Sequence, residues 1–175
     1  MKNTDTKEKI LELLFDFPTK RFYVREISRI LKISAPSISK ALKELEKEDM
    51  IKIERKFLHE IKANLDNADF KNLKRINNLK RIYLSGLFNF LDERFPLDTI
   101  ILFGSYSRGE DIESSDIDIA LIGSKERAMS LEKYEKLLER KINLQFYPGF
   151  KKIETNLKSN ILNGITLKGG IDLQK

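Results

Sequence analysis

The chain of 175 residues contains no cysteine and a single histidine, His59. The absence of cysteine excludes disulfide bonds, thiolate zinc sites and cysteine nucleophiles, and it is compatible with a reducing compartment. A Ser-His-Asp triad, or a metal site made of several histidines, would have to be built around His59 alone. We therefore exclude both kinds of site and expect His59 at the protein surface.

Long apolar segments are also missing. No window approaches the roughly 18 to 20 apolar residues that a membrane span requires, and the first ten residues, MKNTDTKEKI, contain no apolar signal core. With 41% hydrophobic and 34% charged residues, the composition is that of a folded protein, long enough for one medium domain or two small ones. We expect a soluble, cytoplasmic protein with no membrane partner.

Acidic residues are too few to balance the basic ones in the N-terminal half. The whole formal net charge of +6 lies in the first 95 residues, where 21 Lys and Arg outnumber 15 Asp and Glu. The remaining residues carry basic and acidic side chains in equal numbers. An anionic partner is therefore expected to meet the N-terminal half first.

Three short helices are predicted near the N-terminus. Apolar residues recur at helical spacing over residues 10–17, where a proline ends the run, and over residues 24–31. A third helix over residues 34–49 begins at a serine that can cap it. Only Lys32 and Ile33 separate the second helix from the third. A joint this tight is typical of a helix-turn-helix.

The third helix has an apolar side and a polar, basic side. The apolar side consists of Ile38, Ala41, Leu42 and Leu45. The outward side consists of Ser37, Ser39, Lys40, Lys43 and Lys47. A merely solvated helix face would look similar, but small polar and basic residues on one face also suit contact with DNA, which we favour.

Two extended stretches follow, Ile51–Glu54 and Leu58–Ala63, with Arg55 and Lys56 between them. Three helices followed by such a hairpin resemble the winged-helix DNA-binding domains over the first 65 residues. The resemblance implies that a homodimer binds double-stranded DNA through Ser37, Ser39, Lys40, Lys43, Arg55 and Lys56. One departure is Asp49, because such domains usually place a glycine after this helix.

The rest of the chain predicts a connector and an α/β unit. Regularly spaced apolar residues predict one long helix from about Asn67 to Phe95, whose first half is the expected connector. Short apolar runs then predict strands over residues 99–103, 115–122 and 142–147. Helices are expected over about 125–140, capped by Ser124, and over about 151–163, before an extended tail. The expected domains are 1–65, a connector over 66–80, and 81–175, in a mixed α+β fold.

One stretch, LFGSYSRGEDIESSDIDIALIG, combines the residues that chemistry requires. A predicted strand runs into the turn Gly104-Ser105, and ten residues after Ser105 comes Asp116-Ile117-Asp118. Because side chains alternate along a strand, Asp116 and Asp118 project from the same face, about 7 Å apart along it. Two such carboxylates can share divalent ions, and the amides and hydroxyl of the Gly104-Ser105 turn can hold phosphate oxygens.

Three other motifs fail on the same residues. A P-loop starting at Gly104 would need Lys and Ser or Thr where Glu110 and Asp111 stand. A nucleophile elbow at Ser107 lacks the glycine two positions before it and a suitable histidine. An EF-hand loop would need further acids after Asp118, where an apolar run follows instead.

The remaining pattern, Gly-Ser, ten residues, Asp-x-Asp, resembles the signature of the minimal nucleotidyltransferases of the DNA polymerase beta superfamily, over roughly residues 80–175. The resemblance implies a small α/β domain that transfers a nucleoside monophosphate, expected to be AMP, from a nucleoside triphosphate to an acceptor. By this resemblance Asp116 and Asp118 would be the catalytic residues and bind Mg²⁺. Gly104, Ser105 and Arg108 would bind the nucleotide.

The family's third carboxylate lies on a later strand, where this chain has Asn143. An amide cannot accept the acceptor's proton and binds magnesium more weakly than a carboxylate does. Two hypotheses therefore stay open. The chain is a nucleotidyltransferase delivered or regulated by its winged helix, or it is a DNA-binding regulator or antitoxin-like protein, whose degenerate domain senses a nucleotide. A protein acceptor or toxin partner is compatible with either hypothesis.

Overall fold

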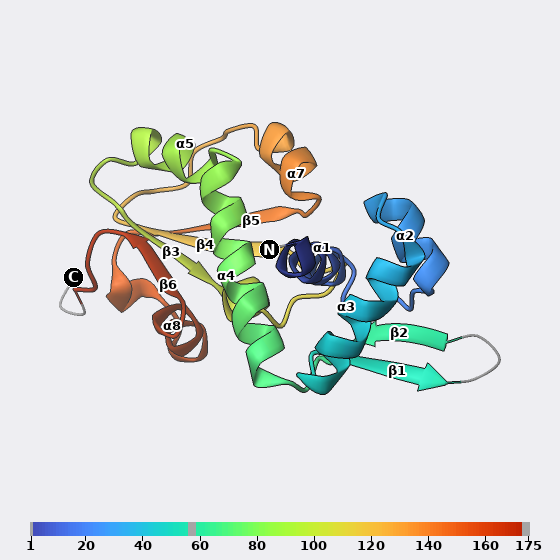
Figure 1. Ribbon diagram of the computed structural model, residues 1–175. Coiled ribbons are helices and arrows are strands. Elements are labelled where there is room, and N and C mark those ends of the chain that lie inside the picture. Colours follow the sequence, from blue (N-terminus) through green and yellow to red (C-terminus); the bar gives the residue numbers. More distant parts are fainter. Residues whose placement is uncertain (1, 56–58, 173–175) are drawn as a thin grey trace. The chain divides into compact units, whose positions relative to one another are not determined.

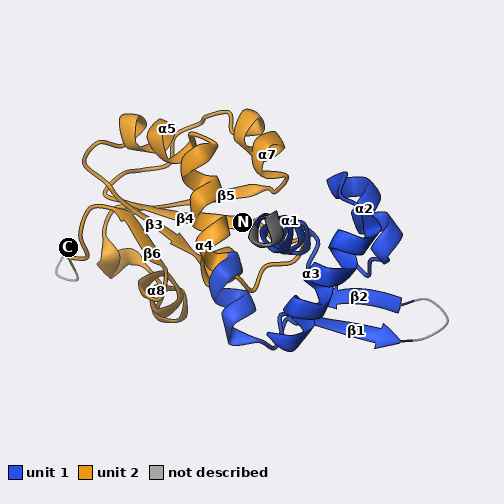
Figure 2. Cartoon of the chain, viewed as in Figure 1, with its two compact units in different colours: residues 1–74 blue, residues 75–175 orange. Residues whose placement is uncertain are grey.

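The computed structural model describes residues 2–55 and 59–172, so the proposed DNA contact Lys56 lies outside the described residues. The chain forms two compact units, residues 1–74 and 75–175 (Figure 2). Their boundary falls inside helix α4 (Ala68–Leu84), within the segment for which the sequence predicts a connector.

The first unit has the predicted order of three helices and a hairpin (Figure 1). Its elements are α1 (Lys2–Asp16), α2 (Val24–Leu31), α3 (Ala35–Lys47), β1 (Ile51–Arg55) and β2 (His59–Ala63). The two strands are antiparallel, and the predicted apolar side of α3 is buried in the core. The predicted serine cap is present, because Ser34 Oγ accepts a hydrogen bond of 3.4 Å from the Ser37 amide.

Asp49 adopts the backbone conformation for which related domains use glycine. Its φ of +56° lies in the left-handed region, which aspartate and asparagine tolerate better than most residues. The Asn64 side chain donates a hydrogen bond of 2.8 Å to the Asp49 carbonyl. This long-range contact fixes the turn between α3 and β1, so the departure at Asp49 leaves the winged helix intact.

The prediction of one long helix from about Asn67 to Phe95 is wrong, because the structure has two helices in this segment. Helix α4 ends at Leu84, and α5 (Leu87–Arg94) begins after Gly86, whose φ is +78°. A residue in the left-handed region cannot continue an α-helix, and glycine adopts it without steric cost. The break turns the chain so that Leu87 and Leu91 of α5 pack into the core of the second unit.

The second unit is built on a four-stranded sheet in the order β5-β4-β3-β6. The strands are β3 (Thr99–Phe103), β4 (Ile117–Ile122), β5 (Ile142–Tyr147) and β6 (Ile165–Lys168). Strand β4 runs parallel to β5 and antiparallel to β3, and β6 pairs with the other edge of β3. The tail expected after Gly164 is therefore an edge strand, and β4 begins two residues later than predicted.

Helices cover both faces of this sheet (Figure 1). On one face α5 and α7 (Glu132–Leu138) pack against the sheet, and on the other lie the 3₁₀ turn η1 (Phe150–Lys152) and α8 (Thr155–Leu162). Helix α7 is shorter than predicted and is not capped by Ser124. The Ser124 hydroxyl instead donates a hydrogen bond of 2.9 Å to the buried carboxylate of Asp98.

Candidate functional site

The turn after β3 lies directly against Asp118 of β4. Phe103 is opposite Asp118 in the antiparallel ladder, so Gly104 follows at the point where the Asp118 side chain projects. Gly104 has a φ of +75°, and a Cβ placed on it would lie 2.5 Å from Asp118 Oδ2. Only glycine permits both this backbone conformation and this approach. The structure therefore brings together two of the residues predicted from the signature.

Asn143 approaches Asp118 from the other side. Strands β4 and β5 are parallel with Asp118 opposite Asn143, and Asn143 Nδ2 donates a hydrogen bond of 3.0 Å to Asp118 Oδ1. Asp118 thus has the Gly104-Ser105 turn on one side and Asn143 on the other. That is where a third carboxylate would lie if residue 143 were acidic.

The two carboxylates of the Asp-x-Asp motif are in different surroundings. Ile117 and Ile119 are buried, whereas Asp116 is exposed and Asp118 is half-buried. Burial raises the pKa of Asp118 above its ordinary value, the hydrogen bond from Asn143 lowers it, and the nearby charge of Asp116 raises it further. An ionised Asp118 is therefore short of compensating positive charge, which a bound cation would supply.

Residues 104–108 form a single helical turn, α6 (Gly104–Arg108). The Ser107 hydroxyl donates a hydrogen bond of 2.8 Å to the Gly104 carbonyl, and the Glu110 amide donates one of 3.0 Å to the Ser105 carbonyl. Ser107 is buried and Ser105 is half-buried, so of these two serines only Ser105 is accessible to a ligand. Of the two serines, only Ser105 matches the signature.

Arg108 is engaged by two residues that the sequence did not single out. Its Nε donates a hydrogen bond of 2.7 Å to Glu110 Oε2, and its Nη1 donates one of 3.1 Å to Asn160 Oδ1 on α8. A nucleotide phosphate at Arg108 would compete with the Glu110 carboxylate. The nearby charge at position 110 is visible in the sequence, but nothing in the sequence indicates the contact with Asn160.

A buried hydrogen-bond pair holds the loop between α6 and β4 in place. Asn78 Nδ2 donates to the Tyr106 carbonyl at 2.9 Å and to Asp111 Oδ1 at 2.7 Å, and both Asn78 and Asp111 are buried. Removing the Asn78 amide would take a hydrogen-bond donor from the buried Asp111 carboxylate and from the Tyr106 carbonyl. Losing such donors at buried acceptors lowers the stability of the fold. Asn78 therefore positions the segment that carries the candidate site without touching it.

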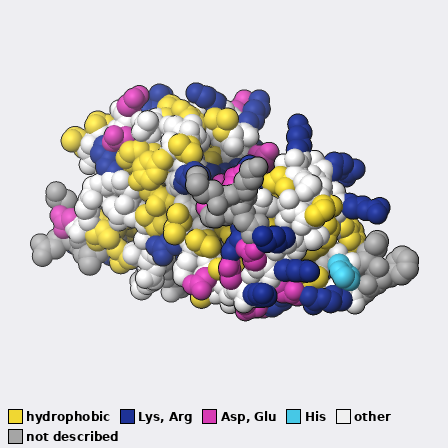
Figure 3. Space-filling view, in the orientation of Figure 1, with side chains coloured by type: hydrophobic (Ala, Val, Ile, Leu, Met, Phe, Trp, Pro, Cys, Tyr) yellow, Lys and Arg dark blue, Asp and Glu magenta, His cyan; other side chains and the backbone are white. Residues whose placement is uncertain are grey.

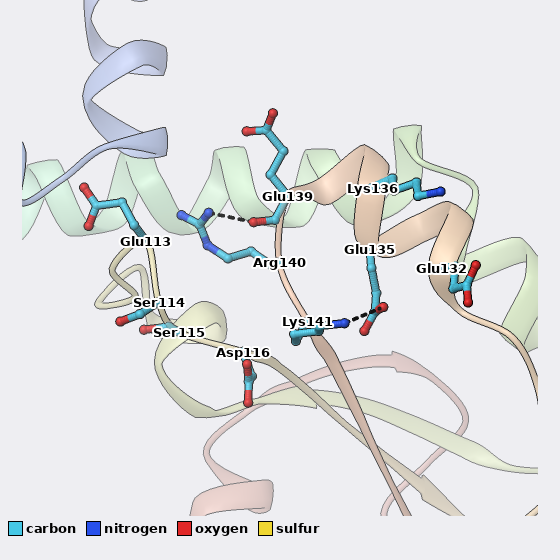
Figure 4. Close-up of a pocket in the computed structure, with 10 residues that line it drawn as sticks. All are labelled: Glu113, Ser114, Ser115, Asp116, Glu132, Glu135, Lys136, Glu139, Arg140 and Lys141. Carbon is cyan, nitrogen blue, oxygen red and sulfur yellow. Dashed lines mark hydrogen bonds and ion pairs between the residues drawn. The ribbon is translucent and has the colours of Figure 1, made fainter.

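A pocket of about 540 Å³ opens beside Asp116 (Figure 4). It is lined by Glu113, Ser114, Ser115, Asp116, Glu132, Glu135, Lys136, Glu139, Arg140 and Lys141. One wall is the loop that enters β4, and the other is α7 with the segment that enters β5. The sequence analysis did not predict this pocket, because its walls come from segments about twenty residues apart.

The residues present fit a magnesium ion that is shared with a nucleotide. No group of three or more His, Cys, Asp or Glu side chains able to hold a metal is found within the described residues, so the chain offers no metal cage of its own there. Magnesium is usually held by one or two carboxylates together with substrate phosphates and water. Asp116 and Asp118, next to a turn that can hold phosphates, form a donor set of this kind.

The candidate DNA-binding surface lies on the first unit, where Lys and Arg side chains stand out in Figure 3. Ser37, Lys40 and Lys43 are exposed on α3, and Ser39 is half-buried. Neither of these two lysines forms an ion pair with any described residue. Arg55 is different, because its Nη2 lies 2.6 Å from Glu46 Oε2, and this pairing reduces the charge that Arg55 offers to DNA.

Comparisons with known proteins match the N-terminal and C-terminal parts of the chain to two different families. Residues 84–167 match the model of the nucleotidyltransferase domain, and residues 4–52 match the model of the bacterial regulatory protein arsR family. A relative from Methanocaldococcus jannaschii, named "Putative protein adenylyltransferase MJ1379", is 36% identical over 67 residues, which are 38% of this chain and 66% of that protein. The match thus spans just under two thirds of the relative's length. No solved structure matches the chain.

The match to the nucleotidyltransferase domain also bears on the candidate metal site. Domains of the nucleotidyltransferase family generally use divalent metal ions, in agreement with the pair of carboxylates beside the turn.

None of the helices in the described parts of the chain has the length and apolarity that crossing a membrane requires.

Proposed function

We propose that this chain, whose residues 84–167 are a nucleotidyltransferase domain and whose residues 4–52 are an ArsR-type helix-turn-helix, transfers AMP from ATP to a hydroxyl group of a protein acceptor. The observation that carries this proposal is the close approach of the Gly104 turn to the Asp118 carboxylate, which supports a role for this turn in binding phosphates beside a metal ligand. The relative named as a protein adenylyltransferase supports the choice of AMP and of a protein acceptor.

In this proposal the Gly104 and Ser105 amides and the Ser105 hydroxyl bind the outer phosphates of ATP, and Arg108 leaves Glu110 to bind them as well. Asp116 and Asp118 hold Mg²⁺. When bound, the ion neutralises charge on the reacting phosphoryl group and on pyrophosphate. The acceptor oxygen forms a bond to the α-phosphorus as the bond to the β-phosphate bridging oxygen breaks, and pyrophosphate leaves.

The acceptor's proton passes to water in this proposal, because Asn143 offers no basic atom. A positioned general base typically contributes about 10²- to 10⁴-fold to the rate. Transfer by this chain is therefore expected to be slower by such a factor than it would be with a carboxylate at position 143.

The N-terminal domain would bring this activity to DNA. A homodimer would bind double-stranded DNA through the exposed residues of α3 and the hairpin, namely Ser37, Ser39, Lys40, Lys43, Arg55 and Lys56. Because Arg55 is paired with Glu46, Lys40 and Lys43, which form no ion pair with a described residue, should contribute more to binding than Arg55 does. We propose that the protein acts in the cytoplasm, where both DNA and ATP are available to it.

A second candidate function is favoured by the hydrogen bond from Asn143 to Asp118. A domain with an amide in this place could bind magnesium and ATP without transferring AMP. The protein would then be a DNA-binding regulator that senses a nucleotide, or an antitoxin-like protein that acts on a toxin partner by binding it.

One experiment separates these functions. The full chain is incubated with Mg²⁺ and ATP labelled on the α-phosphate, with and without protein acceptors, and label on protein and released pyrophosphate are measured beside nucleotide affinity from calorimetry. Asp116→Asn and Asp118→Asn are the test variants. Transfer that both variants abolish supports the enzyme, and magnesium-dependent binding without transfer supports the sensor. Nucleotide binding that neither variant weakens overturns both.

A further inference from the structure

The pocket beside Asp116 has an arrangement that the proposed transfer of AMP does not itself explain. We call it the Glu139 pocket and define it by the ten lining residues named above, four of which lie in the loop 113–116 and six within residues 132–141 (Figure 4). Its volume of about 540 Å³ lies in the range of about 300 to 1,000 Å³ that is usual for pockets that bind ligands. It therefore has room for one or two side chains of another protein.

The sheet places this pocket on the side from which an acceptor must arrive. Helix α6 follows β3, on one side of the central strand β4, whereas β5 and the pocket residue Lys141 lie on the other side. In phosphoryl transfer the attacking and leaving oxygens lie roughly in line across the phosphorus. A pyrophosphate held at α6 therefore leaves toward β3, and the attacking hydroxyl approaches from β5, where the pocket opens beside Asp116.

The charges around the pocket select the class of segment that fits. Its lining contains five acidic side chains and three basic ones. One of the basic side chains is paired with an acidic side chain of the lining, because Lys141 Nζ lies 3.3 Å from Glu135 Oε2. The other oxygen of this carboxylate, Glu135 Oε1, accepts a hydrogen bond of 3.1 Å from the Ile142 amide. Glu132 and Glu139 are exposed and remain available to a basic partner.

Glu139 occupies a position where the backbone favours glycine. It ends α7 with a φ of +54°, in the left-handed region, and its carbonyl accepts a hydrogen bond of 3.0 Å from Arg140 Nη1. A side chain other than Gly, Asn or Asp is uncommon in this conformation, so glutamate at this position costs some stability.

We propose that the Glu139 pocket binds the acceptor segment of a protein and selects segments in which a lysine or arginine lies near the reacting hydroxyl. The proposal rests on the proposed transfer of AMP. The basic side chain binds Glu132 and Glu139, and the hydroxyl points past Asp116 toward the α-phosphorus. Chemically, the acceptor oxygen gains a bond to phosphorus, pyrophosphate leaves, and the proton goes to water.

The test uses the full chain and two pools of synthetic peptides. Each pool has Ser, Thr or Tyr at the centre, flanked by lysines in one pool and by glutamates in the other. AMP incorporation is measured with Mg²⁺ and ATP, and peptide binding is measured with Mg²⁺ and a non-hydrolysable ATP analogue. The test variant is Glu132→Lys combined with Glu139→Lys, and the matched control is Glu93→Lys, which reverses an exposed charge on α5.

We expect the native chain to prefer the lysine pool by about five- to tenfold, the size expected from two exposed ion pairs. The double variant should lose or reverse this preference, and the control should keep it, while both bind Mg-ATP as the native chain does. Glu139→Gly provides a second variant, because it removes the carboxylate and suits the left-handed backbone. It should reduce the preference without loss of stability.

Three results would overturn the inference. The first is a preference for the lysine pool that survives in the double variant, and the second is the absence of charge-selective binding in the native chain. The third is a loss of Mg-ATP affinity in the double variant, which would mean that the pocket holds the nucleoside. Failure of the proposed function is distinguishable, because charge-selective peptide binding without AMP incorporation would leave the pocket assigned and would remove only the transfer.

Discussion

Replacing Gly104 with alanine tests the core of the proposed site, and the chain contains a matched control for it. Gly104 and Gly86 both have left-handed backbones, with φ values of +75° and +78°. A Cβ on Gly104 would lie 2.5 Å from Asp118 Oδ2, whereas a Cβ on Gly86 would have no atom within 4 Å. The two substitutions therefore share the backbone cost and differ only in the contact with Asp118.

The expected magnitudes follow from this comparison. An alanine in the left-handed region costs about 1 to 2 kcal/mol, so both variants should lose that much free energy of unfolding. In Gly104→Ala the Asp118 carboxylate must also move by about 1 Å to reach an ordinary contact of about 3.5 Å. Metal ligands tolerate displacements of only about 0.2 Å. We therefore expect Gly104→Ala, and not Gly86→Ala, to weaken Mg-ATP binding by about 10- to 100-fold.

Two measurements check this prediction: urea denaturation for stability, and calorimetry with Mg²⁺ and ATP for affinity. The useful quantity is the difference between the two variants, because the shared backbone cost cancels in it. If Gly104→Ala binds Mg-ATP as tightly as Gly86→Ala does, the carboxylate of Asp118 is not a ligand that this turn positions. The assignment of the site would then be wrong.

Three further predictions concern residues near the site and on the DNA-binding surface. Asn143→Asp should raise AMP transfer by about 10²-fold or more with little change in ATP affinity; labelled-ATP assays that show no increase would identify another base. Asp118→Asn should stabilise the metal-free protein near pH 7, because the raised pKa of Asp118 makes stability fall as pH rises through that pKa; urea titrations should show the gain shrinking as pH falls through the raised pKa and absent below about pH 4, near the ordinary pKa of aspartate. Lys40→Ala and Lys43→Ala should each lower the salt dependence of DNA binding by about one unit of slope, whereas Lys9→Ala, which removes a lysine paired with Asp5, should not; anisotropy at several salt concentrations would decide.

The sequence predicts the parts of the fold that depend on local pattern. Alternation of apolar and acidic residues places Asp116 and Asp118 on one face, and the structure buries Ile117 and Ile119 on the other. The tight joint before α3 likewise predicts the helix-turn-helix, which the match of residues 4–52 confirms. Both patterns are set by neighbours in the chain, so a single sequence is enough to find them.

The parts that the sequence does not predict depend on partners far away in the chain. Ser124 looks like a helix cap, but its hydroxyl is bonded to Asp98, and α7 begins eight residues later. Strand β6 has only four residues, too few for a clear pattern, and is defined by its pairing with β3. The sequence does not predict the helix break at Gly86, because one glycine inside a helical pattern costs only about 1 kcal/mol and does not by itself require a break.

The central position of β4 explains why the substitution at Asn143 should affect the two halves of the reaction unequally. Asp118 faces Gly104 across one strand pair and Asn143 across the other. The nucleotide would bind on the first side, where the glycine and the close approach to Asp118 are intact. The acceptor would arrive on the second side, where the carboxylate is missing and an amide donates to Asp118 instead. The affinity for Mg-ATP should therefore be close to that of a site with three carboxylates, whereas the rate of transfer should be lower. A preference of the Glu139 pocket for basic acceptors would offset part of that loss by holding the hydroxyl in place, since positioning lowers a barrier even where no base is present.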